Sequence, residues 1–229
     1  MVRSWRSSHC VRWLVALSLL VAVETAALVL AEGPAGRNRN RPHPELGWAG
    51  ACTRGGLSAV HLGDGWILTA AHVGLGSVRI GDEDFPPIPG SEVDFAGTSH
   101  RLPDLALFRV AGTPAGPRLR IASLPPRSGE RVVLMGAGGV RGERFTWRGL
   151  SGFKRAPSQG LQWGENRVAK ESHRLVLGRY NTDAFAVEFD DFYRLPQEAI
   201  ASEGDSGGPV FRIGARGAEL LGILIATSR

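Results

Sequence analysis

The feature that most constrains the fold of this chain is a succession of short β-type segments separated by glycine turns. No stretch shows the 3.6-residue periodicity of a long amphipathic helix, and a single helical turn is expected at 197–202. With 31 glycines and 14 prolines available for turns, the pattern predicts an all-β sandwich or barrel. The expected strands are 57–62, 66–70, 78–80, 105–110, 131–135, 161–168, 174–177, 185–189, 209–213 and 219–226.

The N-terminus has the layout of a secretory signal peptide. Three arginines precede an apolar run, and a small-residue cleavage site ends at Ala31. We therefore expect a signal peptide at 1–31 and a secreted or periplasmic protein with no stable membrane association after cleavage. The alternative is an uncleaved membrane anchor at 13–31, a stretch whose one charge is Glu24.

The rest of the chain divides into a polar arm at 32–47, expected to be flexible, and a domain at 48–229. Of the two cysteines, Cys10 lies in the expected signal peptide, so Cys52 is left as a free thiol that we expect to be buried or semi-buried. The net charge is +5, of which 1–31 carry +2 and 32–47 carry +1. The domain has no long basic run, so nucleic acid is not an expected partner.

Three local sequences bear on chemistry, and they occur in the order His, Asp, Ser. The first, WILTAAH, ends at His72; the second, DLALFRV, begins at Asp104; the third, EGDSGGPV, has Ser206 at its centre. Chance occurrence of LTAAH followed by GDSGGP is negligible. The three segments resemble the signature segments of trypsin/chymotrypsin-like serine proteases, from about residue 57 to the C-terminus.

The resemblance implies two packed six-stranded antiparallel β-barrels, the first at about 48–115 and the second at about 128–229. It also implies the catalytic residues, the oxyanion hole and the pocket. His72 would be the general base, Asp104 its orienting partner and Ser206 the nucleophile of an acyl-enzyme mechanism. The backbone amides of Gly204 and Ser206 would form the oxyanion hole, and the substrate pocket would include Ile200, Ile225 and Thr227. A protein or peptide substrate is expected, and neither a cofactor nor a metal.

The chain departs from the family pattern in ways that create further expectations. No Ile-Val-Gly-Gly-like sequence supplies an N-terminal ammonium for Asp205, so we expect that carboxylate to contact backbone donors or a basic side chain. The basic candidates are Arg141, Lys154 and Arg155. Ile200 stands where the family sets primary specificity, which predicts preference for an uncharged side chain. The sequence ends at Arg229, before the last strand and helix of the family, so the second barrel would be incomplete.

Two other functions compete with a serine endopeptidase. One is a catalytically inactive member of the same fold that binds proteins, which has no chemical need for His72 and Ser206 together. The other is a serine esterase of different fold, because 204–208 fit G-x-S-x-G. That class has Asp and His after the serine, and the order found here excludes it.

Overall fold

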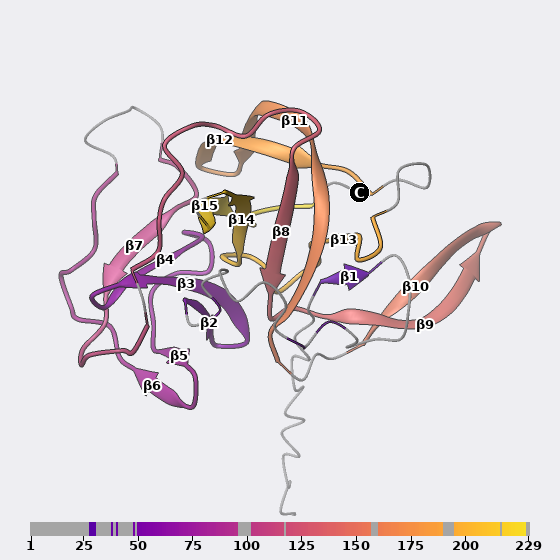
Figure 1. The fold of residues 1–229 in the computed structure, drawn as a ribbon. Coiled ribbons are helices and arrows are strands. Elements are labelled where there is room, and N and C mark those ends of the chain that lie inside the picture. The colour runs from indigo at the N-terminus through magenta and orange to yellow at the C-terminus, as the bar shows by residue number, and fades with distance from the viewer. Residues whose placement is uncertain are drawn as a thin grey trace, which may run out of the picture.

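The computed structural model describes residues 28–30, 38, 40, 48, 50–95, 102–116, 118–156, 160–189, 195–215 and 217–227. All regular structure in these ranges is β, arranged in two curled antiparallel sheets with smaller strand pairs beside them (Figure 1). The expected all-β, double-barrel fold is therefore confirmed. Nowhere in the described ranges is there a helix with the length and apolarity needed to span a bilayer.

The first sheet has six strands in the order β6-β5-β2-β3-β4-β7. Their bounds are β2 (Ala51–Arg54), β3 (Leu57–Gly63), β4 (Trp66–Thr69), β5 (Val78–Ile80), β6 (Glu83–Phe85) and β7 (Ala106–Arg109). Asp64 and Gly65 form the two-residue turn between β3 and β4, and both have positive φ, at 51° and 75°. An Asp-Gly pair adopts this geometry readily, so the hairpin follows from local sequence.

Alternate residues of these strands point into the interior of the first sheet, where Ile67 and Phe108 are fully buried. Cys52 lies in the same core as a free, buried thiol, as expected. Burial raises the pKa of this thiol far above its usual value, so it has no thiolate character at neutral pH.

Within the described residues the second sheet has five strands, in the order β12-β11-β8-β14-β15, where an incomplete six-stranded barrel was expected. Their bounds are β8 (Arg131–Gly136), β11 (Gln162–Leu177), β12 (Tyr180–Val187), β14 (Pro209–Gly214) and β15 (Gly217–Ile223). The long β11 joins two segments that we expected to be separate strands. Its register shifts twice against β12, between Val168 and His173, so the strand continues through irregular pairing rather than breaking.

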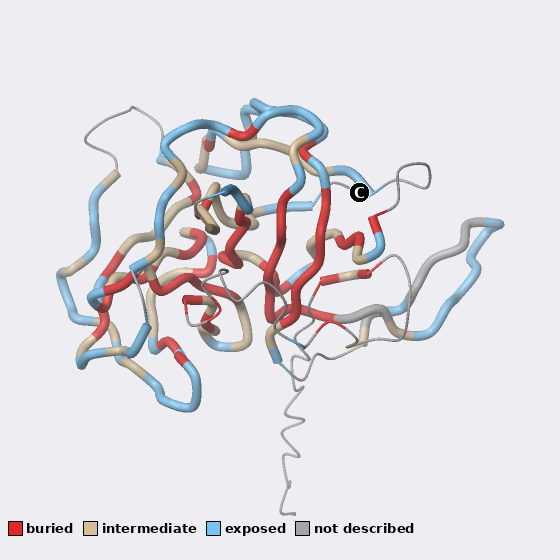
Figure 2. Tube along the Cα trace, viewed as in Figure 1, coloured by how far each residue is buried: buried red, intermediate tan, exposed pale blue. Residues whose placement is uncertain are grey.

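The two sheets meet at a shared apolar cluster. Val60 of β3 packs there with Val133 and Met135 of β8 and Phe211 of β14. Figure 2 shows buried residues running along β8 and into β11 at this junction. The segment between the sheets is hydrogen-bonded to the second sheet, because Ala122 donates its N–H to Leu220 O at 2.9 Å. These contacts fix the position of one sheet relative to the other.

A short N-terminal strand, β1 (Val29–Leu30), pairs with β13 (Ala199–Ile200). Leu28 and Leu30 are 1% and 5% exposed and pack in the core of the second sheet. The helical turn expected at 197–202 is wrong, because Ala199 and Ile200 take β1 as a strand partner. Residues 28–30, which the sequence analysis places in the expected signal peptide, are thus packed in this core.

The expected arm at 32–47 is described only at Asn38 and Asn40, and neither is detached from the domain. Asn38 is 2% exposed, its Nδ2 donates to Trp163 O at 3.0 Å, and its carbonyl accepts from Trp163 N–H at 3.3 Å. Asn40 Oδ1 accepts from Trp163 Nε1 at 3.3 Å. The remaining arm residues and residues 1–27 lie outside the described part of the chain.

A hairpin of β9 (Val140–Trp147) and β10 (Leu150–Ala156) extends away from both sheets (Figure 1). None of the strands expected from the sequence lies in this segment. Its turn at Arg148 and Gly149 again has two positive φ angles, 50° and 82°. That geometry matches the twist of the flanking strands.

Candidate active site

His72 and Asp104 lie just outside two adjacent strands of the first sheet. His72 follows the end of β4, Asp104 precedes β7, and these strands pair with Thr69 opposite Ala106. His72 Nδ1 lies 2.7 Å from Asp104 Oδ2, and the His72 backbone N–H donates to Oδ1 at 2.9 Å. Both carboxylate oxygens therefore bind one residue, which sets the position and the orientation of the imidazole. The His72 side chain is 39% exposed and that of Asp104 is 1% exposed, so the ring faces solvent from a buried anchor.

A residue of the second sheet binds the backbone of Asp104. Thr182 on β12 is buried, and its Oγ1 accepts the backbone N–H of Asp104 at 2.7 Å. Sequence reasoning missed Thr182, because a threonine in a strand carries no local signal of a contact 78 positions away.

Ser206 lies in the turn between β13 and β14, pressed against the first sheet. Its carbonyl accepts from Ser58 N–H at 3.1 Å. Gly207 has a φ of 86°, and a Cβ there would overlap Ser58 O and Thr69 Oγ1. The GDSGGP turn can thus approach β3 and β4 closely only with glycine at 207. This contact brings Ser206 beside the strand that leads to His72.

Among the residues that the structure describes, no hydrogen bond joins the side chains of Ser206 and His72. Catalytic hydrogen bonds are often long in unliganded enzymes and tighten when substrate binds.

Some backbone N–H groups around Ser206 donate to other backbone carbonyls and others do not. Asp205 N–H donates to Ser202 O at 3.1 Å, Gly207 N–H to Leu224 O at 2.7 Å and Gly208 N–H to Asp205 O at 2.8 Å. Within the described residues, the N–H groups of Gly204 and Ser206 have no protein acceptor. These are the two amides expected to form the oxyanion hole.

Asp205 points away from these amides into the protein and is 0% exposed. Its Oδ1 accepts from Gly138 N–H at 2.9 Å, and its Oδ2 accepts from Ser202 N–H at 2.8 Å and Ser202 Oγ at 3.3 Å. The expectation of backbone donors is confirmed. Burial raises the pKa of Asp205 to about 7, against the opposing effect of the Ser202 and Gly138 hydrogen bonds.

Of the basic candidates for Asp205, Lys154 instead pairs with exposed Glu143 at 3.1 Å. The side chains of Arg141 and Arg155 lie outside the described part of the structure.

The three expected pocket residues lie on two different segments. Ile225 and Thr227 follow β15, and Leu224 just before them bonds both Gly207 and Gly208 of the serine turn. Ile200 is half-buried in β13, where it pairs with Val29 of β1. The 224–227 segment is therefore attached to the serine turn, whereas Ile200 is held by the N-terminal strand.

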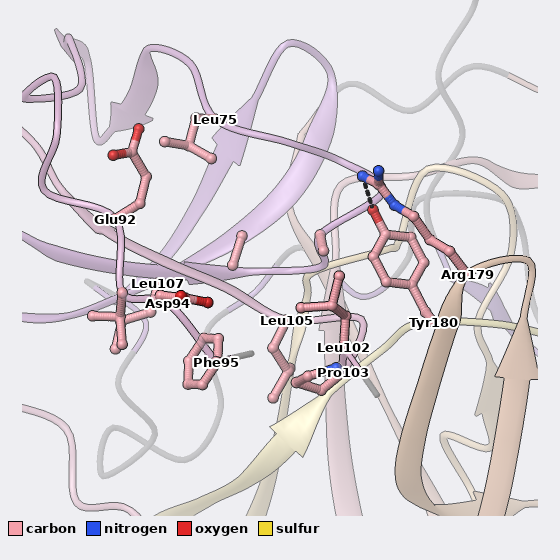
Figure 3. Close-up of a pocket in the computed structure, with 13 residues that line it drawn as sticks. Leu75, Glu92, Asp94, Phe95, Leu102, Pro103, Leu105, Leu107, Arg179 and Tyr180 are labelled. Carbon is pink, nitrogen blue, oxygen red and sulfur yellow. Dashed lines mark hydrogen bonds between the residues drawn. The ribbon is translucent and has the colours of Figure 1, made fainter. Parts of the chain in front are cut away.

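A cavity of about 260 Å³ is lined by residues that flank Asp104 in the sequence (Figure 3). Pro103 and Leu105, the neighbours of Asp104, line it together with Tyr180, whose hydroxyl accepts from Arg179 at 2.9 Å. Its lining includes Ala71, the neighbour of His72, but none of His72, Asp104 and Ser206 themselves.

Residues 57–223 match the trypsin-like peptidase domain family. The chain belongs to this family. The family is one of proteases, which are hydrolases that act on proteins or peptides. No curated protein matches the chain significantly.

Solved structures with the same architecture include proteases from distant organisms. An inactive form of the Rv3671c protease of M. tuberculosis has a TM-score of 0.52 and 21% identity, covering 81% of this chain and 82% of that one. Neuropsin, a serine protease of mouse brain, has a TM-score of 0.50 and 20% identity, covering 81% of this chain and 84% of that one. At such identities the similarity shows a shared fold.

Proposed function

We propose that this trypsin-like peptidase is a serine endopeptidase in which Ser206 is the nucleophile, His72 the general base and Asp104 its orienting partner. The observation that carries the proposal is the double hydrogen bond between His72 and buried Asp104. An ionised carboxylate only accepts hydrogen bonds, so Nδ1 carries the proton and Nε2 is left as the base. The free amides of Gly204 and Ser206 supply the second requirement of acyl transfer.

The proposed reaction has two halves. Ser206 Oγ attacks the peptide carbonyl as its proton passes to His72 Nε2, and the Gly204 and Ser206 N–H groups stabilise the oxyanion. His72 then protonates the leaving amine, which gives an acyl-enzyme. Water, activated by the same nitrogen, hydrolyses this ester and regenerates Ser206. Throughout, Asp104 stabilises the imidazolium that forms beside it.

We propose that substrates carry an apolar or small side chain before the scissile bond. Ile200 provides no carboxylate for an arginine or lysine side chain. Cleavage of a peptide library should therefore disfavour both cations at this position. A cleavage pattern dominated by arginine or lysine would contradict this proposal without affecting the catalytic one.

We further propose that the protein is exported and keeps β1 after processing. The burial of Leu28 and Leu30 supports a cut on the N-terminal side of Leu28 rather than after Ala31. Intact mass and N-terminal sequencing of protein from the medium or periplasm test this. A chain that begins at Glu32 would refute it.

The proposed activity is best tested by labelling with a fluorophosphonate, which reacts with an activated serine whatever the substrate preference. We expect the native protein to label, and Ser206→Ala and His72→Ala to abolish labelling, because triad members act as a unit. Ser91→Ala is the matched control and should label normally. The Ser91 hydroxyl lies with Ile88 and Arg109: it donates to Ile88 O at 2.6 Å and to Arg109 O at 3.3 Å, and it accepts from Arg109 N–H at 3.0 Å. Folded native protein that does not label would favour the inactive, protein-binding alternative.

A further inference from the structure

Ser58 of β3 is a buried serine whose polar groups all have partners near the serine turn. It is 0% exposed. Its N–H donates to Ser206 O at 3.1 Å, and its hydroxyl donates to Gly204 O at 3.3 Å. The same hydroxyl accepts from Ala137 N–H at 2.9 Å, while Ser58 O accepts from Thr69 Oγ1 at 2.9 Å. One residue of the first sheet is thus bonded to both ends of the segment that carries Asp205 and Ser206.

The glycine run at 136–139 completes this arrangement from the end of β8. Two consecutive N–H groups of the run are used, that of Ala137 on Ser58 Oγ and that of Gly138 on Asp205 Oδ1. Gly136 has no room for a side chain, because a Cβ there would overlap the Asp205 carboxylate. The run therefore holds the Ser58 hydroxyl and the Asp205 carboxylate side by side.

We propose that Ser58 is a positioning residue that keeps the Gly204–Ser206 turn in its oxyanion-binding form. The inference rests on the proposed function, and deepens it by naming what holds the oxyanion amides in place. The carbonyls of Gly204 and Ser206, both bound by Ser58, lie on either side of the Ser206 N–H. Fixing them restricts rotation of the peptide units that carry this amide.

Such restraint matters because the turn is intrinsically free to rearrange. Gly204 has a φ of 97°, in a region where glycine moves between conformations at little cost. Oxyanion stabilisation depends on donors that are already aligned before charge develops. Without the Ser58 hydroxyl, Gly204 O loses its donor and buried Ala137 N–H loses its acceptor. Because unpaired buried polar groups cost free energy, the turn would rearrange to find new partners for them.

The test compares Ser58→Ala and Ser58→Cys with the native protein and with Ser91→Ala. The cysteine variant nearly preserves shape but forms much weaker hydrogen bonds, so it serves as the test if the alanine variant fails to fold. The readouts are the fluorophosphonate labelling rate, kcat and KM for p-nitrophenyl acetate, and inhibition by phenylboronic acid, which forms a tetrahedral adduct with an active serine. All are measured well below the unfolding midpoint of each variant.

For Ser58→Ala we expect kcat and the labelling rate to fall by about 10- to 100-fold, somewhat less than loss of an oxyanion donor itself. KM should change by less than about threefold, and the boronic acid should bind more weakly by a factor similar to that lost in kcat. Ser58→Cys should lie between alanine and native, and Ser91→Ala should match native. A purely structural role would lower the amount of active protein without this link between kcat and boronic acid affinity.

The outcomes separate the two proposals. If the native protein labels and both Ser58 variants keep native rates and boronic acid affinity, the positioning role is wrong and the proposed function stands. If the loss in the variants is explained entirely by a reduced folded fraction, the positioning role is again wrong. If folded native protein does not label, the proposed function fails and the positioning role with it.

Discussion

The molecule contains two buried aspartates within its candidate active site, and their surroundings differ. Asp104, 1% exposed, gives both carboxylate oxygens to His72, one to the ring and one to the backbone. Asp205, 0% exposed, accepts from Gly138 and Ser202, which are neutral groups. Asp104 sits against a side chain that can become a cation, whereas the described partners of Asp205 cannot change charge.

The difference indicates two separate tasks for two similar residues. A carboxylate beside an imidazole can stabilise positive charge that appears during a reaction. A carboxylate bound by amides organises the backbone around it, since each N–H that it accepts fixes one peptide group. We therefore expect changes at Asp104 to affect mainly rate, and changes at Asp205 to affect mainly stability and its dependence on pH.

The largest expected effect is that of Asp104→Asn on turnover. The amide cannot accept hydrogen bonds at both positions, so it favours the wrong imidazole tautomer, and kcat should fall by about 10⁴-fold. Kinetics with p-nitrophenyl acetate and a thermal melt measure rate and stability together. Asp84→Asn, which disrupts an exposed ion pair with Arg79, is the control and should leave kcat unchanged. A loss of less than tenfold would remove the distinction between the two aspartates.

The pH dependence of stability should be set in part by Asp205. Its pKa is about 7 in the folded protein against a reference value of 3.8, so between these values the native state holds a proton that the unfolded chain has released. The free energy of unfolding should therefore decrease as pH rises through this window, by up to about 1.4 kcal/mol per pH unit from this group, and level off above pH 7. Urea denaturation from pH 4 to 8 measures this slope.

The matched comparison is Asp205→Asn, which cannot ionise and should lose this contribution to the slope. Asp84→Asn should keep it. If native protein and Asp205→Asn show parallel stability profiles, Asp205 is ionised throughout the range and its hydrogen bonds outweigh its burial.

Strand β1 lies beside the segment that binds Asp205. It pairs with β13, and β13 leads directly into Ser202, whose N–H donates to the Asp205 carboxylate. Leu30→Ala leaves a cavity in the core of the second sheet and should lower the free energy of unfolding by about 3 kcal/mol. Urea denaturation checks this value. Exposed Leu124, 62% exposed, offers a control, and Leu124→Ala should change stability by less than about 0.5 kcal/mol. Equal, small effects at both positions would mean that β1 is not part of the folded core.

The smallest expected effect concerns Thr182, which supports Asp104 from the second sheet. Thr182→Val leaves the buried N–H of Asp104 without its acceptor, and should cost about 1 kcal/mol of stability and a several-fold decrease in kcat. Thr182→Ser keeps the oxygen and should restore the rate. Equal kinetics for the valine and serine variants would show that Asp104 needs no support from the second sheet.

Much of the fold could be predicted from local sequence. Short β-type runs and glycine turns indicated an all-β protein, and the Asp64-Gly65 pair accounts for one hairpin by its own conformational preference. The segments around His72, Asp104 and Ser206 identified the family, because turn geometry and residue chemistry there depend on neighbours in sequence. A free, buried or semi-buried Cys52 was expected because Cys10 lies in the expected signal peptide and no activating motif surrounds Cys52, and the thiol is buried.

Other features depended on partners far along the chain. The 197–202 segment has no strand signal of its own, and Ala199–Ile200 become a strand because β1 offers an unpaired edge. Asn38, expected in a flexible arm, is buried against Trp163 by bonds to its backbone. Ser58 and Thr182 are inconspicuous in sequence and reach the candidate active site across 146 and 78 positions.

The sequence by itself thus determined the kind of strands, the tight turns and the chemical groups of the candidate site. The tertiary structure alone decided which neutral donors bind Asp205, which serine holds the turn and where the N-terminal strand lies. The physical reason is that backbone conformation and side-chain chemistry are local properties. Satisfaction of a buried polar group or an exposed strand edge depends instead on whichever distant segment packs against it.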